Sequence, residues 1–241
     1  MSSTPSHYVV KSPTVNGRYL SEYMVASELR KRTIIRDCKY RAIAKVIQHD
    51  RAKAFITNFL KRPDKTKHML LSEAARLYEM MADSPFERNL LDVNADFLSA
   101  YAEVFSQADL PLVEFVDAPP NFKLGLNGVE VNPDIRLSLQ RTNKNNRLRT
   151  GLLTIRYAKG KPLAEEVGLW HSSLLYACRR HIDQYDEAEA ELKLCLTLDA
   201  VTGRMIAAPT NAIYRFKNIE AACASIAERW DSIEPPDGAI L

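Results

Sequence analysis

Cysteine is scarce in this sequence, and its few copies are far apart. The 241 residues contain four cysteines, and none of them lies at CxxC spacing from another or beside a histidine at ligand spacing. This scatter argues against a zinc site and against a disulfide framework. We therefore expect four buried thiols, at Cys38, Cys178, Cys195 and Cys223.

Glycine-rich loops and long apolar runs are also missing. The isolated glycines of the second half argue against a nucleotide-hydrolysing P-loop and a dinucleotide-binding fold. No apolar run approaches the length that spans a bilayer, and the first residues lack a basic segment followed by an apolar one. We therefore expect a cytoplasmic protein with no membrane partner.

The first half of the chain predicts helices. Residues 1–18 are polar and contain two prolines and a glycine, which indicates a flexible arm with one short strand at residues 8–10. From residue 19 to residue 108 glycine is almost absent, and apolar residues recur at steps of three and four. We expect a helical lobe over residues 19–108, with a break near His49.

The second half predicts short strands and two helices. β-branched and aromatic residues gather in segments that are separated by Pro-Pro, Asn-Gly and Asn-rich turns, and helices are predicted from Pro162 and from Asn218. The predicted strands are 112–116, 122–126, 135–140, 152–157, 192–198, 205–208 and a further segment at 212–216. The two halves together predict an α+β fold, in which the helical lobe precedes a mixed β-sheet flanked by helices over residues 109–241.

Charge is unevenly distributed along the chain. Residues 1–70 carry fifteen Lys and Arg against five acids, whereas residues 71–117 carry two against ten. A basic segment of this kind suits contact with nucleic-acid phosphates, because cations release the counterions of the nucleic acid. The alternative is that these cations form solvated helix faces paired with the acidic segment. The candidate phosphate contacts are Arg30, Lys31, Arg32, Arg36, Lys39 and Lys45, with Arg147 and Arg149 at the turn of the predicted hairpin.

Two short motifs flank the predicted hairpin of residues 135–157. Asn132-Pro133-Asp134 precedes its first strand, and Tyr157-Ala158-Lys159 ends its second strand. Because the two strands are predicted to be antiparallel neighbours, Asp134 and Lys159 are expected at the same end of the sheet. Asn-Pro-Asp is also a common turn sequence, and an ion pair between Asp134 and Lys159 would account for both residues without catalysis.

This arrangement resembles the core of the PD-(D/E)XK nuclease superfamily over roughly half of the chain, residues 111–215. The resemblance implies a restriction-endonuclease-like core that acts on DNA. In that core Asp134 would bind a divalent metal, usually Mg²⁺, and Lys159 would position the attacking water. Hard oxygen ligands suit Mg²⁺, and the metal lowers the pKa of its bound water.

The second acid of the superfamily motif is missing from its usual position. Tyr157 stands two residues before Lys159, where the superfamily has Asp or Glu. Members of the superfamily can carry this acid on the following helix, where Glu165 and Glu166 lie. Helical geometry places Glu166 beside the apolar stripe and Glu165 on the far side, so Glu166 is the better candidate.

Two further acids, Glu114 and Glu130, are candidates at the same edge of the sheet. Each candidate acid has the alternative of a solvated surface carboxylate. The resemblance thus implies Asp134, Lys159 and Glu166 as catalytic residues, and Asp134, Glu166 and Glu114 as Mg²⁺ ligands. His171, beside Trp170 on the predicted helix, is expected to be structural because no serine or cysteine at nucleophile spacing accompanies it.

Two functions from different classes follow. The first is a nucleic-acid-acting protein with a PD-(D/E)XK-like core, which either cleaves DNA with Mg²⁺ or retains a degenerate core bound to DNA. The alternative is a catalytically inactive scaffold or subunit, which holds a protein or nucleic-acid partner, or a second copy of itself, through the basic helical lobe.

Overall fold

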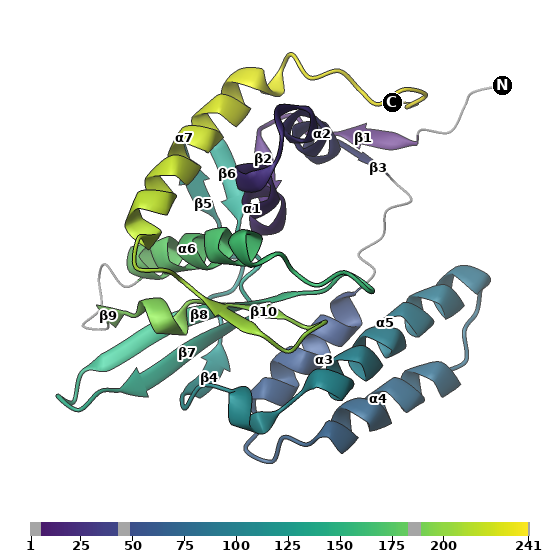
Figure 1. The fold of residues 1–241 in the computed structure, drawn as a ribbon. Helices are drawn as coiled ribbons and strands as arrows, with labels where there is room; N and C mark the ends of the chain where they lie inside the picture. The colour runs from purple at the N-terminus through teal and green to yellow at the C-terminus, as the bar shows by residue number, and fades with distance from the viewer. Residues whose placement is uncertain (1–5, 43–48, 183–188, 241) are drawn as a thin grey trace.

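The computed structural model describes residues 6–42, 49–182 and 189–240 and has an α+β fold (Figure 1). As the sequence predicts, helices come first along the chain and a mixed sheet flanked by helices follows. The central sheet is six-stranded and separates two hydrophobic cores, one on each face.

The central sheet has the strand order β11-β10-β8-β7-β4, and β9 pairs with β8 beside this path. Strands β4, β7 and β8 are antiparallel neighbours, and α6 (Glu165–Ile182) then leads to β10, which runs parallel to β8. The predicted hairpin pairing is confirmed, because Leu137 of β7 lies opposite Leu153 of β8. The strands are β4 (Glu114–Asp117), β7 (Leu137–Thr142), β8 (Leu148–Arg156), β9 (Glu189–Ala190), β10 (Leu196–Asp199) and β11 (Met205–Ala207).

Two small sheets lie outside the central sheet. Strand β6, which the sequence did not predict, forms a hairpin with β5 around Asn127 and Gly128, whose positive φ angles of 43° and 82° suit a tight hairpin turn. The segment expected to be a flexible arm contributes β2, parallel to β6, and β1, antiparallel to β3. The strands are β1 (His7–Val9), β2 (Thr14–Asn16), β3 (Tyr40–Ala42), β5 (Leu124–Leu126) and β6 (Val129–Asn132).

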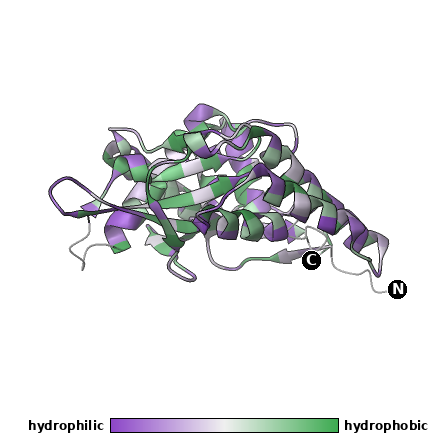
Figure 2. Ribbon diagram, turned by 90° about the horizontal axis from the view of Figure 1, so that it is seen from below, coloured by the Kyte–Doolittle hydropathy of each residue, from purple (hydrophilic) through white to green (hydrophobic). Residues whose placement is uncertain are grey.

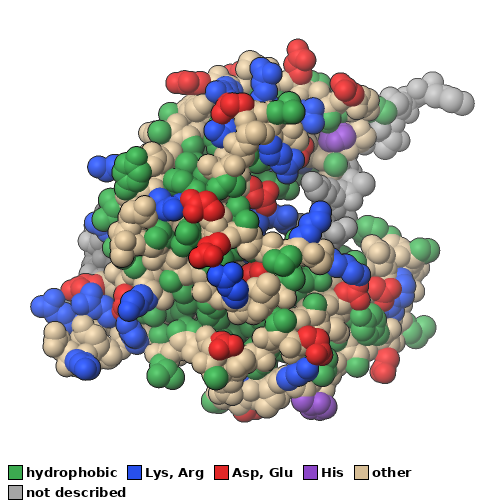
Figure 3. Space-filling view, in the orientation of Figure 1, with side chains coloured by type: hydrophobic (Ala, Val, Ile, Leu, Met, Phe, Trp, Pro, Cys, Tyr) green, Lys and Arg blue, Asp and Glu red, His purple; other side chains and the backbone are tan. Residues whose placement is uncertain are grey.

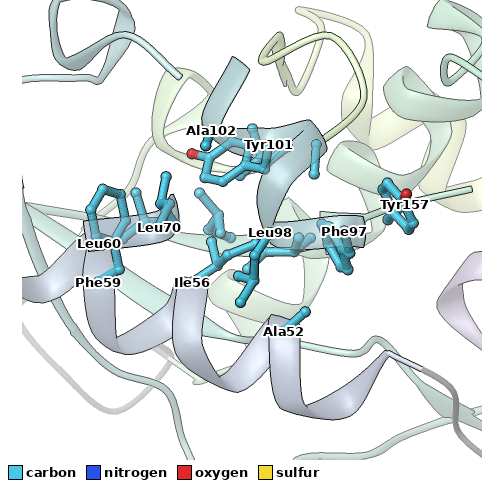
Figure 4. Close-up of a cluster of buried hydrophobic side chains, with 14 of the residues drawn as sticks. Ala52, Ile56, Phe59, Leu60, Leu70, Phe97, Leu98, Tyr101, Ala102 and Tyr157 are labelled. Carbon is cyan, nitrogen blue, oxygen red and sulfur yellow. The ribbon is translucent and has the colours of Figure 1, made fainter. Parts of the chain in front are cut away.

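Three helices pack on one face of the central sheet: α3 (Asp50–Lys61), α4 (Lys67–Glu79) and α5 (Pro85–Val104). Helix α5 begins where Ser84 accepts the backbone N–H of Glu87, with proline in its first turn. Figure 4 shows the interlocking side chains of this core, and each large apolar side chain contributes about 1.5–3 kcal/mol by burial. A short 3₁₀ turn, η1 (Gln107–Asp109), follows α5.

The opposite core contains α1 (Gly17–Val25), α2 (Glu28–Lys39), α6 and α7 (Ala212–Trp230). The helices of residues 19–108 are therefore divided between the two faces of the sheet, because α1 and α2 pack with α6 and α7. The predicted strand at 212–216 is wrong, since these residues begin α7, where Ile213 and Tyr214 face solvent. Another 3₁₀ turn, η3 (Leu192–Leu194), precedes β10.

Hydropathy follows this arrangement. Apolar residues fill the strands and the inward faces of the helices, and the projecting tip of the β7–β8 hairpin is hydrophilic (Figure 2). All four cysteines are buried thiols, as expected. Among the described residues, no helix is long and apolar enough to cross a membrane.

Candidate functional site

The backbone of Asp134 is held in an uncommon conformation between β6 and β7. Its φ of 54° lies in the left-handed region, which aspartate tolerates better than most residues. The Asn132 side chain accepts the N–H of Asp134 at 3.0 Å, and the Thr154 hydroxyl of β8 donates to the carbonyl of Asp134 at 2.8 Å. These two bonds fix the direction in which the Asp134 side chain leaves the sheet.

Both carboxylate oxygens of Asp134 are engaged by cations. Lys53 Nζ of α3 lies 2.8 Å from Oδ2, and Arg136 Nη2 lies 2.7 Å from Oδ1. Burial of the carboxyl would raise its pKa, but the charges of Lys53 and Arg136 outweigh this effect and lower the pKa below its ordinary value. Asp134 is therefore ionised at neutral pH, with its side chain only 16% exposed.

Lys53 enters this site from a distant part of the sequence. Its side chain lies between α3 and the start of β7 and is 18% exposed. Burial lowers the pKa of Lys53, and the nearby Asp134 carboxylate opposes that effect. Arg136 also reaches Asp50 at the start of α3, with 3.6 Å between nitrogen and oxygen.

Arg156 ends β8 and is 8% exposed. Its Nη2 donates to Glu22 of α1 at 2.9 Å, and the same carboxylate oxygen accepts from Arg18 at 3.2 Å. Burial, together with the charge of Arg18, lowers the pKa of the Arg156 guanidinium. The other terminal nitrogen, Nη1, is buried and has no hydrogen-bond partner among the described residues.

His171 of α6 lies fully buried behind Asp134. Its Nε2 is 3.1 Å from the carbonyl oxygen of Pro133, and because a carbonyl can only accept, Nε2 carries the proton. Burial lowers the pKa of His171 to about 3, so the ring is neutral near pH 7. A Cβ at Gly17 would come within 2.9 Å of Nε2, so glycine is needed where α1 meets this ring. The expectation of a structural histidine agrees with this burial.

These side chains form one group, which we call the Asp134 cluster. It draws on α1, α3, the segment before β7 and the end of β8, with Asp50 at its edge. Its cations outnumber its carboxylates. The members are Arg18, Glu22, Lys53, Asp134, Arg136 and Arg156.

The structure does not pair Asp134 with Lys159, so the ion pair between them that was the alternative to catalysis is wrong. Lys159 Nζ lies 2.6 Å from Asp96 of α5, and its side chain is 75% exposed. Strand β8 ends at Arg156, so the alternation of side chains that the prediction extended to Lys159 stops before it. Tyr157 instead stacks on Phe97, with 3.9 Å between ring centroids.

The other candidate acids lie away from Asp134. Glu166 is exposed in the first turn of α6 and pairs with Arg215 of α7 at 2.7 Å. Glu114 is exposed on the edge strand β4 opposite Gln140, toward the tip of the hairpin. Glu165 pairs with Arg204 at 3.4 Å, and Glu130 with Lys123 at 2.8 Å.

The donors expected for Mg²⁺ therefore do not fit a metal centre. Both oxygens of Asp134 face cations, and Glu166 and Glu114 are on other elements. Within residues 6–42, 49–182 and 189–240, no three His, Cys, Asp or Glu side chains gather as metal ligands would. A divalent ion needs several oxygen ligands around one point, which this arrangement does not supply.

The candidate phosphate contacts on α2 have several different environments. Arg30 and Arg32 are exposed, Arg36 is half-buried, and Lys31 pairs with Glu28 at 2.9 Å. Lys45 lies outside the described residues. The acidic segment pairs instead with other cations: Lys61 with Asp117, Lys67 with Glu103 and Lys159 with Asp96.

Lys39 is a candidate phosphate contact that is buried inside the fold. It is 8% exposed, and its Nζ donates to the carbonyls of Trp230, Asp231 and Ile233 at 2.7, 3.1 and 3.1 Å. A lysine at this place satisfies the open carbonyls at the C-terminal end of α7. Phosphate contact by Lys39 is therefore contradicted, because its donors are used inside the fold.

Arg147 and Arg149 lie on the β7–β8 hairpin, as expected, and both contact Glu189 of β9, Arg147 at 3.0 Å. Arg141 of the same hairpin pairs with Glu191. The hairpin tip is thus exposed and basic, but much of its charge is paired locally.

Sequence patterns did not single out Arg136, Arg156 or Glu22 as site residues, and Lys53 was noted only as part of the basic segment of residues 1–70. One local signal was available: Thr154 and Arg156 stand two apart on β8, as acid and lysine do in the nuclease motif, and they face Asp134. Comparisons of the chain with protein-family models, with curated proteins and with solved structures found no match. The function is therefore argued from the chemistry of the Asp134 cluster.

Proposed function

We propose that this protein binds nucleic acid through its phosphate backbone, with the Asp134 cluster as the centre of the binding surface. One observation carries the proposal: Arg18, Lys53, Arg136 and Arg156 converge from separate elements on Asp134 and Glu22. Arginine is suited to phosphate because its planar N–H groups match two oxygens at once. The basic hairpin tip is an additional contact surface in this proposal.

The proposed core is nuclease-like in arrangement but acts as a binding module. Its support is the order of elements, the antiparallel strands β7 and β8, the helix α6 and the parallel strand β10, with Asp134 in the segment just before β7. Mg²⁺-dependent cleavage is the less favoured activity, because a metal at Asp134 would have to displace both Lys53 and Arg136. In the scaffold alternative a partner binds the basic helical lobe. In this proposal nucleic acid contacts the Asp134 cluster.

The test is filter binding of a labelled DNA duplex across a salt series, in EDTA and in Mg²⁺. Phosphate contacts should give a linear fall of log K with log salt, with a slope of about −0.9 per contact. The DNA should remain intact in both buffers. Affinity that does not depend on salt would contradict the proposal, and cleavage that requires Mg²⁺ and Asp134 would restore the nuclease interpretation.

A further inference from the structure

We infer that the Asp134 cluster contains a site for one phosphate group, held without a metal by the unpartnered N–H groups of Arg156 and Arg136. The inference rests on the proposed function and makes it more specific, since it names the group of the nucleic acid that enters the cluster and the atoms that hold it.

Unsatisfied donors point to a ligand at this place. Arg156 Nη1 and Arg136 Nε are both buried and have no hydrogen-bond partner among the described residues. Buried polar groups in native proteins are nearly always hydrogen-bonded, and the rule is strictest for charged groups. A guanidinium nitrogen can only donate, so the missing partner is an acceptor.

The end of the hairpin brings the two arginines into one cluster. Arg136 donates its backbone N–H to Leu153, and the Thr154 hydroxyl reaches the carbonyl of Asp134, so residues 134–136 stay beside the end of β8, where Arg156 lies. The charges of Arg136 and Arg156 both lower the pKa of Lys53, so both guanidinium groups lie near its ammonium group. One tetrahedral anion could accept from both guanidinium groups.

The charge balance favours a singly charged ligand. Four cations, Arg18, Lys53, Arg136 and Arg156, surround the carboxylates of Asp134 and Glu22, with the carboxylate of Asp50 at the edge. One positive charge is left over when His171 is neutral. A phosphodiester carries one negative charge, and burial of unpaired charge is unfavourable, so a backbone phosphate completes the balance.

The cluster has a route to solvent. In the space-filling view, Lys, Arg, Asp and Glu side chains lie around a hollow near the centre of this face (Figure 3). The side chains of Lys53, Arg136 and Glu22 keep 18%, 24% and 25% of their surface exposed. A phosphate would reach these exposed parts from solvent, and Nη1 of Arg156 and Nε of Arg136, which are buried, would become its donors as the two guanidinium groups rotate toward it.

The experiment uses inorganic phosphate as the probe and the melting temperature of the full chain as the readout. Phosphate should raise the melting temperature relative to chloride at equal ionic strength, and the rise should saturate, as binding at one site requires. General exclusion of phosphate from the protein surface would give a rise that keeps increasing with concentration. A wild-type protein without a saturable rise overturns the inference.

Two substitutions assign the effect to these atoms. Arg156→Lys keeps the charge but loses the planar donors, so the concentration of phosphate for half the effect should increase by about tenfold or more. Arg204→Lys, at an exposed ion pair on the loop before β11, is the matched control and should leave it unchanged. Equal responses from the two variants overturn the inference. If Arg156→Lys does not fold, Glu22→Gln replaces it, and loss of the negative charge beside Arg156 should strengthen phosphate binding; weaker or unchanged binding is the opposing result.

Binding of DNA is measured on the same samples, which separates this inference from the proposed function. DNA binding without a saturable phosphate response would leave the proposed function standing and remove the site. A saturable phosphate response without DNA binding would leave the site standing and remove nucleic acid as its ligand. A short oligonucleotide with and without a 5′-phosphate distinguishes an internal phosphodiester from a terminal phosphate, and the inference requires that both forms bind equally.

Discussion

The Asp134 cluster and helix α2 both contain several cationic side chains, but the surroundings of these side chains differ. On α2, Arg30 and Arg32 are exposed, Lys31 has a partner within the helix, and Lys39 is used inside the fold. In the Asp134 cluster, side chains from distant segments converge, and two buried arginine nitrogens are left without a partner among the described residues, compared with one, Arg36 Nε, on α2. The count of cations is high in both regions, so convergence rather than number distinguishes a candidate site.

The surroundings of the two regions differ in charge as well. A groove of about 970 Å³ lies between α2 and the C-terminal segment, and it is lined by acids and bases in equal number. The charged residues of this lining are Glu28, Arg32, Arg36, Arg229, Glu234 and Asp237. The lining of this groove is balanced in charge, whereas the Asp134 cluster has an excess of positive charge, which favours the approach of an anion.

The largest effect on the unfolding free energy is expected from removing the charge of the Asp134 carboxylate. Asp134→Asn leaves Lys53 and Arg136 without their shared partner, and loss of one member of a buried ion pair destabilises by about 3–5 kcal/mol. Urea unfolding measures the change. A site made only of metal-free acids would instead lose almost no stability, because removing one acid relieves repulsion.

Asp96→Asn provides the matched control for this substitution. It removes the partner of Lys159, whose side chain is 75% exposed, and an exposed ion pair contributes under about 1 kcal/mol. Equal losses for Asp134→Asn and Asp96→Asn would contradict the distinction between a converging cluster and surface pairs.

A second prediction compares two cations of α2, the buried Lys39 and the exposed Arg32. Lys39→Met keeps the aliphatic part of the side chain but leaves three carbonyls at the end of α7 without their donor, and should destabilise by about 2–3 kcal/mol. Arg32→Gln, on an exposed part of α2, should change the unfolding free energy by less than about 0.5 kcal/mol. Urea unfolding of both variants measures these changes. An unchanged unfolding free energy for Lys39→Met would show that Lys39 does not cap α7.

The third prediction concerns pH. The pKa of His171 is about 3 in the folded protein and near 6.5 in the unfolded chain, so between these values only the unfolded state binds the proton. This contribution to stability should therefore fall as pH is lowered, by about 2 kcal/mol at pH 5. His171→Gln keeps a donor for the Pro133 carbonyl and should flatten the dependence of the unfolding free energy on pH.

His68→Gln is the control for the pH series, because His68 is exposed on α4. Its pH profile should follow that of the unmodified protein. A His171→Gln profile as steep as that of the unmodified protein would show that the ring takes up its proton in the folded state.

Local patterns predicted part of this structure well. The hairpin of β7 and β8 was expected because two β-rich segments flank an Asn-rich turn, and its strands pair as predicted. Asp134 was placed correctly at the end of that hairpin. The strand predicted at 212–216 failed because burial of Ile219, Cys223 and Trp230 along one helical face outweighs the local preference of Ile213 and Tyr214.

The partners of Asp134 could not be found in the same way. Lys53 and Asp134 are 81 positions apart, and Glu22 and Arg156 are 134 apart, so no short pattern records their contact. Lys159 was favoured by its place in the Tyr157-Ala158-Lys159 motif, but β8 ends at Arg156 and Lys159 pairs with Asp96. Long-range packing of α1 and α3 against the end of the hairpin decides which cation meets which acid.

The most direct test of the account compares one residue from each region in DNA binding. The affinities of Arg156→Lys and Arg32→Lys for the same duplex are measured at one salt concentration in EDTA. The account predicts that Arg156→Lys weakens binding by about tenfold or more, since planar donors are lost where phosphate enters. It predicts that Arg32→Lys changes binding by less than about twofold, because a solvated cation is replaced by another. A loss with Arg32→Lys and none with Arg156→Lys would contradict the account and return the binding surface to α2.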